Sequence, residues 1–283
     1  MRAQNEATTL DVTTPLGQRV VDTPAAVLQH LQSLHLRVAL HTLSASERGK
    51  IVRALAALPS FESNALVAHV RSISLVDGRF ANGMTIASSA PSGTLYDIVV
   101  NAPVLDETVS AFLTRKERGC YRSSASGAEL TVEAGSQDAV LYVLLHEAMH
   151  VVDQISPAQI SVSYAAEPPR LAAHIWKDSL TVDSAYQSPF LGGGCFRHGI
   201  PDSIEDVQAT YEALRSSPFV SLYGSSNPYD DSADLVAVYH LTHVLHEPYR
   251  IILRAQERTI LSIEPMASPA VKRRFSGVEA LYK

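Results

Sequence analysis

Residues 144–153 read LLHEAMHVVD, and this short stretch constrains the chain more than any other. His146 and His150 are four positions apart, so in an α-helix they lie one above the other on the same face. Two imidazole nitrogens on one face can bind a single zinc ion at about 2 Å. Glu147 follows the first histidine and points to one side of the metal, where a carboxylate can accept a proton from zinc-activated water. The spacing predicts a zinc site with its general base.

The residues around this motif are apolar, which indicates a buried helix. A helix predicted to start at Ser136 runs through SQDAVLYVLLHEAMHVVDQI, and its first half is almost wholly hydrophobic. Burying two histidines and a glutamate without partners would cost several kcal/mol. A bound metal removes that cost. The zinc site is therefore favoured over a chance match on a helix that faces solvent.

A second segment, LYGSSNPYDDSADLVAVYHL at residues 222–241, can supply the missing ligand. A catalytic zinc usually has three protein ligands and one open position. Asn227 is a good N-cap, and Pro228 suits the first helical position. Asp230 and Asp234 are then four residues apart on one helix face. One of them can ligate the metal while the other accepts a hydrogen bond from a ligand histidine.

These two segments resemble the gluzincin metallopeptidases, of which thermolysin is the familiar member. The closer likeness is to the catalytic domain of anthrax lethal factor and related proteins, which carry a "YGxxNxxExxAE"-like segment and a "HExxHxxDD"-type helix. This chain has YGSSNPYDDSAD and HEAMHVVD. The resemblance covers only these segments. It implies that Asp230 is the third zinc ligand, that Asp234 orients a ligand, and that Tyr223 stabilises the tetrahedral intermediate. Both acids are Asp where the family has Glu, so the second helix must approach the metal more closely.

Three further residues have open roles. Asp153, one turn after His150, is either a hydrogen-bond partner of the metal site or an exposed charge at the helix end. His198 lies in the glycine-rich stretch LGGGCFRHG, which could fold over the site and bind substrate, although loop histidines are more often incidental. Asp231 is turned about 100° from Asp230 on the same helix. We expect it to contribute only a favourable charge at the helix N-terminus.

The pattern of elements predicts an α+β fold. Helices are expected at 24–42, from 45 to before Pro59, at 104–118, and from Ser136 through the metal motif. Short apolar runs with turn signals between 65 and 101 predict strands, and ELTVEAG predicts another. Three C-terminal helices are expected near 202–216, 228–246 and 248–262. The resemblance implies a zincin-like arrangement, with a small mixed sheet packed on the buried metal helix and a helical C-terminal lobe.

This order predicts two regions. Residues 1–60 would form a helical N-terminal region, and residues 61–283 a metallopeptidase domain. Within that domain we expect the sheet and metal helix at 61–156, a loop-rich insertion at 157–200 and the helical lobe at 201–283.

Composition excludes some partners and leaves the compartment open. The 283-residue chain has a formal net charge of −6, which argues against a nucleic-acid surface. No stretch approaches the roughly 20 apolar residues needed to span a bilayer. The N-terminal residues are polar and lack the apolar core of a leader, which slightly favours an exported protein without its leader over a cytoplasmic one. Cys120 and Cys195 could form one disulfide or remain two buried thiols.

The resemblance implies a zinc-dependent metallopeptidase, an endopeptidase that acts on peptide or protein substrates with Glu147 as general base. Two alternatives remain. One is a zinc hydrolase of a non-peptide amide, and the other is a metal-binding interaction module without turnover. The sequence does not indicate the substrate, the regulation or the oligomeric state.

Overall fold

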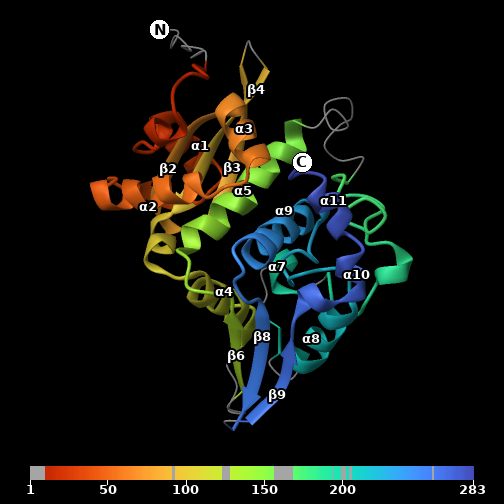
Figure 1. The fold of residues 1–283 in the computed structure, drawn as a ribbon. Helices are drawn as coiled ribbons and strands as arrows, with labels where there is room; N and C mark the ends of the chain where they lie inside the picture. The colour runs from red at the N-terminus through yellow and green to blue at the C-terminus, as the bar shows by residue number, and fades with distance from the viewer. Residues whose placement is uncertain are drawn as a thin grey trace.

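The computed structural model describes residues 10–90, 93–122, 128–155, 168–192, 194–198, 202–203, 206–256 and 258–283. Within these ranges the chain combines a four-stranded mixed sheet, two smaller sheets and helices, which confirms the predicted α+β class (Figure 1). None of the described helices is long and apolar enough to cross a membrane.

The main sheet has the strand order β1(Arg37–Leu40), β2(Val70–Arg79), β4(Gly93–Asn101), β3(Gly83–Ala90). The central strands β2 and β4 run parallel, and the outer pairs are antiparallel. Both central strands are buried over most of their length, and the buried residues include the polar Ser72, Ser74 and Asp97. Strand β3 lies at the edge and pairs only with β4 among the described strands.

Helices cover both faces of this sheet. On one face α1(Ala25–Ser33) packs its Val27 and Leu31 against Val76, Ile86 and Val99. On the other face lie α2(Ala45–Ala56), α3(Ser60–His69) and α5(Ala139–Ile155), whose apolar side chains form the large core. Helix α2 begins with the capping box that the sequence predicts, in which Ser44 and Glu47 bond each other's backbone amides.

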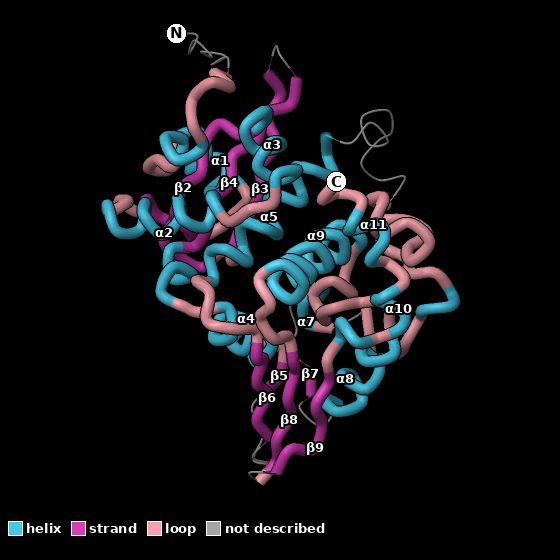
Figure 2. The backbone as a smooth tube through the Cα atoms, in the orientation of Figure 1, coloured by secondary structure: helices cyan, strands magenta, loops and turns pink. Residues whose placement is uncertain are grey.

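The metal-motif helix α5 lies between the sheet and α9(Pro228–Tyr239) (Figures 1 and 2). Thirteen of the 17 residues of α5 are buried, as its apolar sequence predicts. Helix α9 is even more enclosed, with 11 of its 12 residues buried, and it passes into a π-helical turn at His240–Val244. Two helices distant in sequence therefore meet in the interior.

The remaining elements surround this pair. Strands β6(Ala128–Glu133), β8(Arg250–Ala255) and β9(Arg258–Ile263) form an antiparallel sheet at one end of the molecule (Figure 2). The short strands β5(Tyr121–Arg122) and β7(Asp202–Ser203) pair with each other. The other helices are α4(Val109–Arg118), α7(Cys195–His198), α8(Val207–Ser216), α10(Pro269–Lys272) and α11(Phe275–Glu279), with 3₁₀ turns at Leu16–Arg19, Ala102–Asp106, Ser184–Tyr186 and Pro265–Ala267.

Several predicted elements are wrong. The helix expected at 24–42 ends at Ser33, His35 takes a positive φ of 60°, and 37–40 is strand β1. The run ALVAHV, predicted as a strand, lies mostly in α3. The helix expected at 248–262 is the β8–β9 hairpin, so the C-terminal lobe is not purely helical. These Ile- and Leu-rich residues form strands and not a helix because β8 pairs with β6, which lies far away in the sequence.

The predicted regions are only partly comparable with the structure. The N-terminal region 1–60 is not purely helical, because β1 joins the main sheet through β2. Much of the insertion expected at 157–200 lies outside the described residues. The division at residue 60 stays a prediction.

Cys120 and Cys195 form a disulfide, which decides between the two alternatives left by the sequence. It ties Cys120, two residues beyond the end of α4, to Cys195, the first residue of α7, with the two Cα atoms 5.2 Å apart. Disulfides persist mainly in oxidising compartments, and the location of the protein stays a prediction.

Loss of this disulfide is expected to lower stability substantially. The bridge closes a loop of 75 residues, worth up to about 4 kcal/mol in the chain-entropy model. Replacing both cysteines with serine should lower the melting temperature by about 5–10 °C in calorimetry. A reductant should lower the melting temperature of the wild type only. An equal effect on the double variant would contradict this assignment.

Candidate metal centre

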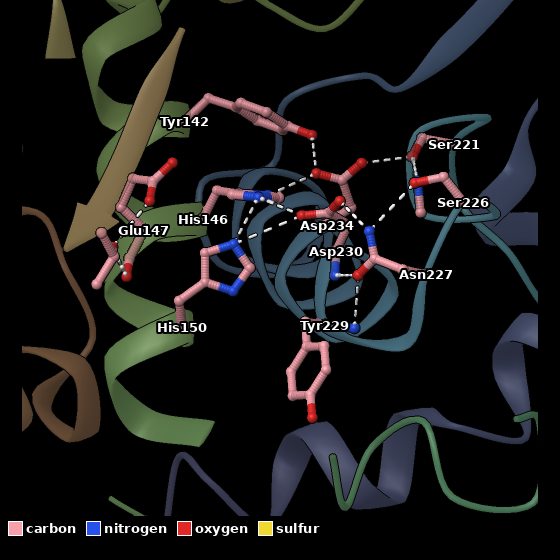
Figure 3. Close-up of polar contacts among 12 residues, drawn as sticks. Tyr142, His146, Glu147, His150, Ser221, Ser226, Asn227, Tyr229, Asp230 and Asp234 are labelled. Carbon is pink, nitrogen blue, oxygen red and sulfur yellow. Dashed lines mark hydrogen bonds and ion pairs between the residues drawn. The ribbon is translucent and has the colours of Figure 1, made fainter. Parts of the chain in front are cut away.

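Three side chains from α5 and α9 converge on one point (Figure 3). The Nε2 atoms of His146 and His150 are 3.1 Å apart, and Asp230 Oδ1 lies 3.3 Å and 3.5 Å from them. Tetrahedral ligands at about 2.0–2.1 Å from zinc are separated from each other by about 3.3–3.4 Å. The mutual spacing of these atoms therefore fits a tetrahedral zinc site. Among the described residues this is the only such group of His, Cys, Asp or Glu that could hold a metal ion.

Asp234 holds His146 in the orientation this group requires. Its Oδ1 accepts a hydrogen bond from His146 Nδ1 at 2.8 Å and another from the Tyr142 hydroxyl at 2.7 Å. Its other oxygen accepts a hydrogen bond from Ser221 Oγ, so the fully buried carboxylate has three donors. With Nδ1 committed to Asp234, the Nε2 of His146 faces Asp230 and His150. The hydrogen bond predicted between Asp234 and a histidine of the site is present.

Asp230 is held by the cap of its own helix. The side-chain oxygen of Asn227 accepts hydrogen bonds from the backbone amides of Tyr229 and Asp230, at 3.0 and 2.9 Å. The side-chain amide of Asn227 donates to Asp230 Oδ2, which leaves Oδ1 facing the two histidines. The shorter side chain of aspartate reaches them because α9 packs directly against α5. An aspartate in place of the glutamate of the gluzincin pattern requires this close approach of α9 to α5.

The charges of the group are strongly coupled. Burial lowers the pKa of His146, but the carboxylates of Asp230 and Asp234 outweigh burial and raise it to about 10. Burial raises the pKa of Asp234, yet the charge of Lys116 and the hydrogen bond from His146 bring it down to about 2. Both histidines likewise lower the pKa of Asp230 against the effect of burial. Without metal, His146 is therefore a cation between two carboxylates near neutral pH.

Zinc binding is expected to release a proton from His146. Because its pKa of about 10 lies above neutral pH, a metal must displace the proton on Nε2. Affinity for zinc should therefore rise about tenfold per pH unit between pH 7 and 9 and level off near pH 10. Calorimetric titration in two buffers of different ionisation enthalpy measures the protons released. Binding without proton release at pH 7.5 would show that His146 is not a ligand.

Glu147 lies beside the ligand group and is not part of it. Its carboxylate is buried, with 5% of the residue exposed, and Thr85 Oγ1 lies 2.8 Å from Oε2. Gly83, on the same edge strand β3, leaves room for it. A Cβ at Gly83 would come within 2.6 Å of Glu147 Oε1 and 2.7 Å of Val143 Cγ1. Sequence reasoning missed both β3 residues, because only packing brings that strand onto α5.

Tyr223 lies beside the ligand group, and its role as a hydroxyl donor stays a prediction. Its ring centre is 5.6 Å from that of His146. Burial, followed by the negative charges of Asp230 and Glu147, raises the pKa of Tyr223 far above its ordinary value. The phenol therefore keeps its proton at neutral pH and can donate a hydrogen bond.

A cavity of about 210 Å³ opens onto these groups. Its wall combines the start of β3, three aromatic rings from outside α5, and residues of α5 itself. The lining residues are Ala81, Asn82, Gly83, Phe112, Lys116, Tyr142, Val143, His146, Glu147, Phe196 and Tyr223. Two larger hollows elsewhere on the surface contain none of the metal-site residues.

The residues with open roles have different outcomes. Asp153 is 5% exposed, so it is not a solvent-facing charge, and burial raises its pKa to about 7. No hydrogen bond joins it to either histidine within the described part of the chain. The side chain of His198 lies outside the described residues, so its substrate-binding role stays a prediction.

The expectation for Asp231 is wrong. Its carboxylate is fully buried and pairs with Arg274 through both oxygens, at 2.7 and 3.0 Å. Trp176 Nε1 donates a third hydrogen bond at 2.9 Å. The face turned away from the metal meets the C-terminal segment and not water, because α9 is enclosed on all sides. Asp231 therefore anchors the lobe.

Comparisons of the chain with models of protein families, with curated proteins and with solved structures find no match. What is known of the site therefore rests on its own geometry: a buried His146–His150–Asp230 group that could hold a metal ion.

Proposed function

We propose that this chain is a zinc-dependent metallopeptidase of the gluzincin type, with a zincin-like arrangement of sheet, metal helix and ligand helix. His146, His150 and Asp230 would hold the zinc. One observation carries the proposal: a carboxylate outside the ligand group, Glu147, shares a single cavity with a ligand histidine and the Tyr223 hydroxyl. A structural metal site has four protein ligands and needs neither of these neighbours.

Each residue then has a defined task in hydrolysis. Zinc supplies a Lewis acid that makes water reactive near neutral pH and polarises a carbonyl group. Glu147 accepts a proton from the attacking water and passes a proton to the amine nitrogen as the C–N bond breaks. Thr85 donates a hydrogen bond to Oε2 of Glu147 and so fixes the position of that carboxylate. The Tyr223 hydroxyl donates to the carbonyl oxygen as negative charge develops there, and loss of such a donor costs about 10²–10³ in rate.

The substrate would bind as an extended peptide along β3. An edge strand offers unpaired backbone groups, and a peptide can add to it by main-chain hydrogen bonds. Residues 81–83, where β3 begins, line the cavity beside Glu147. Support for a peptide substrate comes from this adjacency of a free strand edge and the candidate base.

Metal analysis and proteolysis together test the proposal. Purified protein should contain about one zinc per chain. It should cleave an unstructured protein, and a chelator should abolish cleavage until zinc is restored. Absence of any transition metal, even after reconstitution, would overturn the proposal. Metal binding without peptide cleavage would favour the alternatives, and turnover of small amides would distinguish the hydrolase from the interaction module.

A further inference from the structure

Lys116 projects from α4 into the cavity of the candidate metal centre. Its Nζ lies 3.7 Å from the centre of the Tyr223 ring and 5.7 Å from that of Phe196. The same cavity is lined by Glu147 and His146. A lysine ammonium therefore lies between aromatic rings, next to the place where a peptide bond would be cleaved.

This ammonium has no carboxylate partner among the described residues. Its neighbours on α4 differ: Arg115 pairs with Glu107 and Arg118 pairs with Glu129, each at 2.7 Å. Those two pairs lie at the surface, whereas Lys116 is turned inward. The position of Lys116 in the cavity is therefore not explained by an ion pair with any described residue.

The nearby buried carboxylates are already satisfied by other donors. Asp234 accepts hydrogen bonds from His146, Tyr142 and Ser221. Glu117 accepts one from Tyr211, and Glu147 one from Thr85. Lys116 stabilises the charge of Asp234 from a distance and lowers its pKa. Lys116 lines the cavity, and its ammonium has three N–H donors beside the aromatic rings.

We infer that Lys116 binds a carboxylate of the substrate next to the scissile bond, supplied by an acidic side chain or by a free carboxyl terminus. This inference rests on the proposed peptidase function and adds a substrate class to it. The cavity, with a volume of about 210 Å³, has room for one carboxylate-bearing side chain. The ammonium favours a carboxylate through a charge-assisted hydrogen bond, and its positive charge disfavours a basic side chain.

The disulfide supports this subsite mechanically. Cys120 follows Lys116 by four residues, just beyond the end of α4, and Cys195 directly precedes Phe196. The bridge thus connects the helix that carries the ammonium to the segment that carries one of its aromatic neighbours. The two sides of the subsite are joined covalently.

A matched set of peptides tests the inference. After the cleavage site in an unstructured protein is mapped by mass spectrometry, peptides are made with Glu, Gln or Lys at one position at a time beside it. Each is made with a free and an amidated carboxyl terminus. We expect kcat/KM to be about 10–100-fold higher for a carboxylate at one position, the worth of a hydrogen bond between charged groups. If amidation of the terminus abolishes the preference, Lys116 binds the free carboxyl terminus. If replacement of Glu by Gln abolishes it, Lys116 binds the acidic side chain.

Variants of Lys116 must change that preference and not only the rate. Lys116→Gln should reduce the Glu-to-Gln ratio, or the free-to-amidated ratio, to near one, and Lys116→Arg should preserve it. Lys116→Glu should reverse it in favour of the Lys peptide. Arg115→Gln, a neighbour paired at the surface, is the matched control and should keep the wild-type ratio. An equal loss for all peptides would overturn the inference and leave Lys116 as a positioning residue for Tyr223.

Binding separates failure of this inference from failure of the proposed function. Calorimetry on zinc-loaded Glu147→Gln protein measures the affinity for the same peptides without turnover. A carboxylate preference that disappears in the Glu147→Gln, Lys116→Gln double variant supports the subsite even if the wild type cleaves none of them. Equal affinity for all peptides in both proteins would overturn it.

Discussion

Replacement of Glu147 by glutamine is expected to lower peptide cleavage by at least about 10²–10⁴-fold, the typical contribution of a general base. Zinc content should not change, because the ligand group consists of His146, His150 and Asp230. The amide matches the carboxylate in size and can still accept the hydrogen bond from Thr85. Only its ability to take a proton is lost, so the effect should fall on kcat more than on KM.

The matched control for this change is Glu133→Gln. Glu133 is an exposed residue of β6 that pairs with Arg250 at 3.4 Å, far from the metal centre in the small sheet. It should keep both zinc and activity. Elemental analysis and a quenched-peptide assay measure the two properties. Loss of zinc from Glu147→Gln would mean that the carboxylate is a ligand, and unchanged activity would mean that another group accepts the proton.

The metal group could be predicted from sequence because it depends on local rules. Four-residue spacing places His146 and His150 on one face of α5, and the cap at Asn227 sets where α9 begins. The same spacing then places Asp230 and Asp234 together. The only tertiary fact required is that the two helices meet, and the apolar sequence around the motif indicated that α5 is buried.

What the sequence could not predict depends on contacts between distant elements. Thr85 and Gly83 reach Glu147 because β3 lies on α5, and no local pattern marks that contact. Lys116 stands between two arginines in the run RKER, and only the packing of α4 turns it into the cavity. The β8–β9 hairpin could not be predicted for the same reason, since its pairing partner β6 lies over 100 residues earlier.

The error over Asp231 has an instructive physical origin. On a helix at the surface of a domain, a side chain turned about 100° from the buried face is exposed to solvent, and the prediction for Asp231 depends on that rule. Helix α9 is instead enclosed on all sides, so its second face needs its own partners. Arg274 and Trp176 supply them, although neither lies near Asp231 in the sequence.

Alanine substitutions at the three neighbouring aspartates should therefore have three different effects. Asp230→Ala should remove zinc or weaken its binding drastically, because one of three ligands is lost. Asp234→Ala should weaken zinc affinity by about 10–100-fold, the usual cost of losing the partner that orients a ligand histidine. Asp231→Ala should leave zinc affinity unchanged and lower the free energy of unfolding by about 3–5 kcal/mol. That loss far exceeds the ~0.3–1 kcal/mol of a helix-end charge, because Arg274 would remain buried without its partner.

Competition with a chromophoric chelator measures zinc affinity, and urea unfolding of the metal-free proteins measures stability. Asp230→Glu is the control for the ligand and should still bind zinc. The double variant Asp231→Ala, Arg274→Met is the control for the ion pair. It should recover part of the lost stability, because removing both charges of a buried pair is far less costly than removing one. If Asp234→Ala lost zinc while Asp230→Ala kept it, the ligand would lie one turn further along α9. Tyr223 would then be too far from the metal to donate a hydrogen bond to the carbonyl oxygen. Both its proposed role and the assignment of Asp230 as a ligand would be wrong.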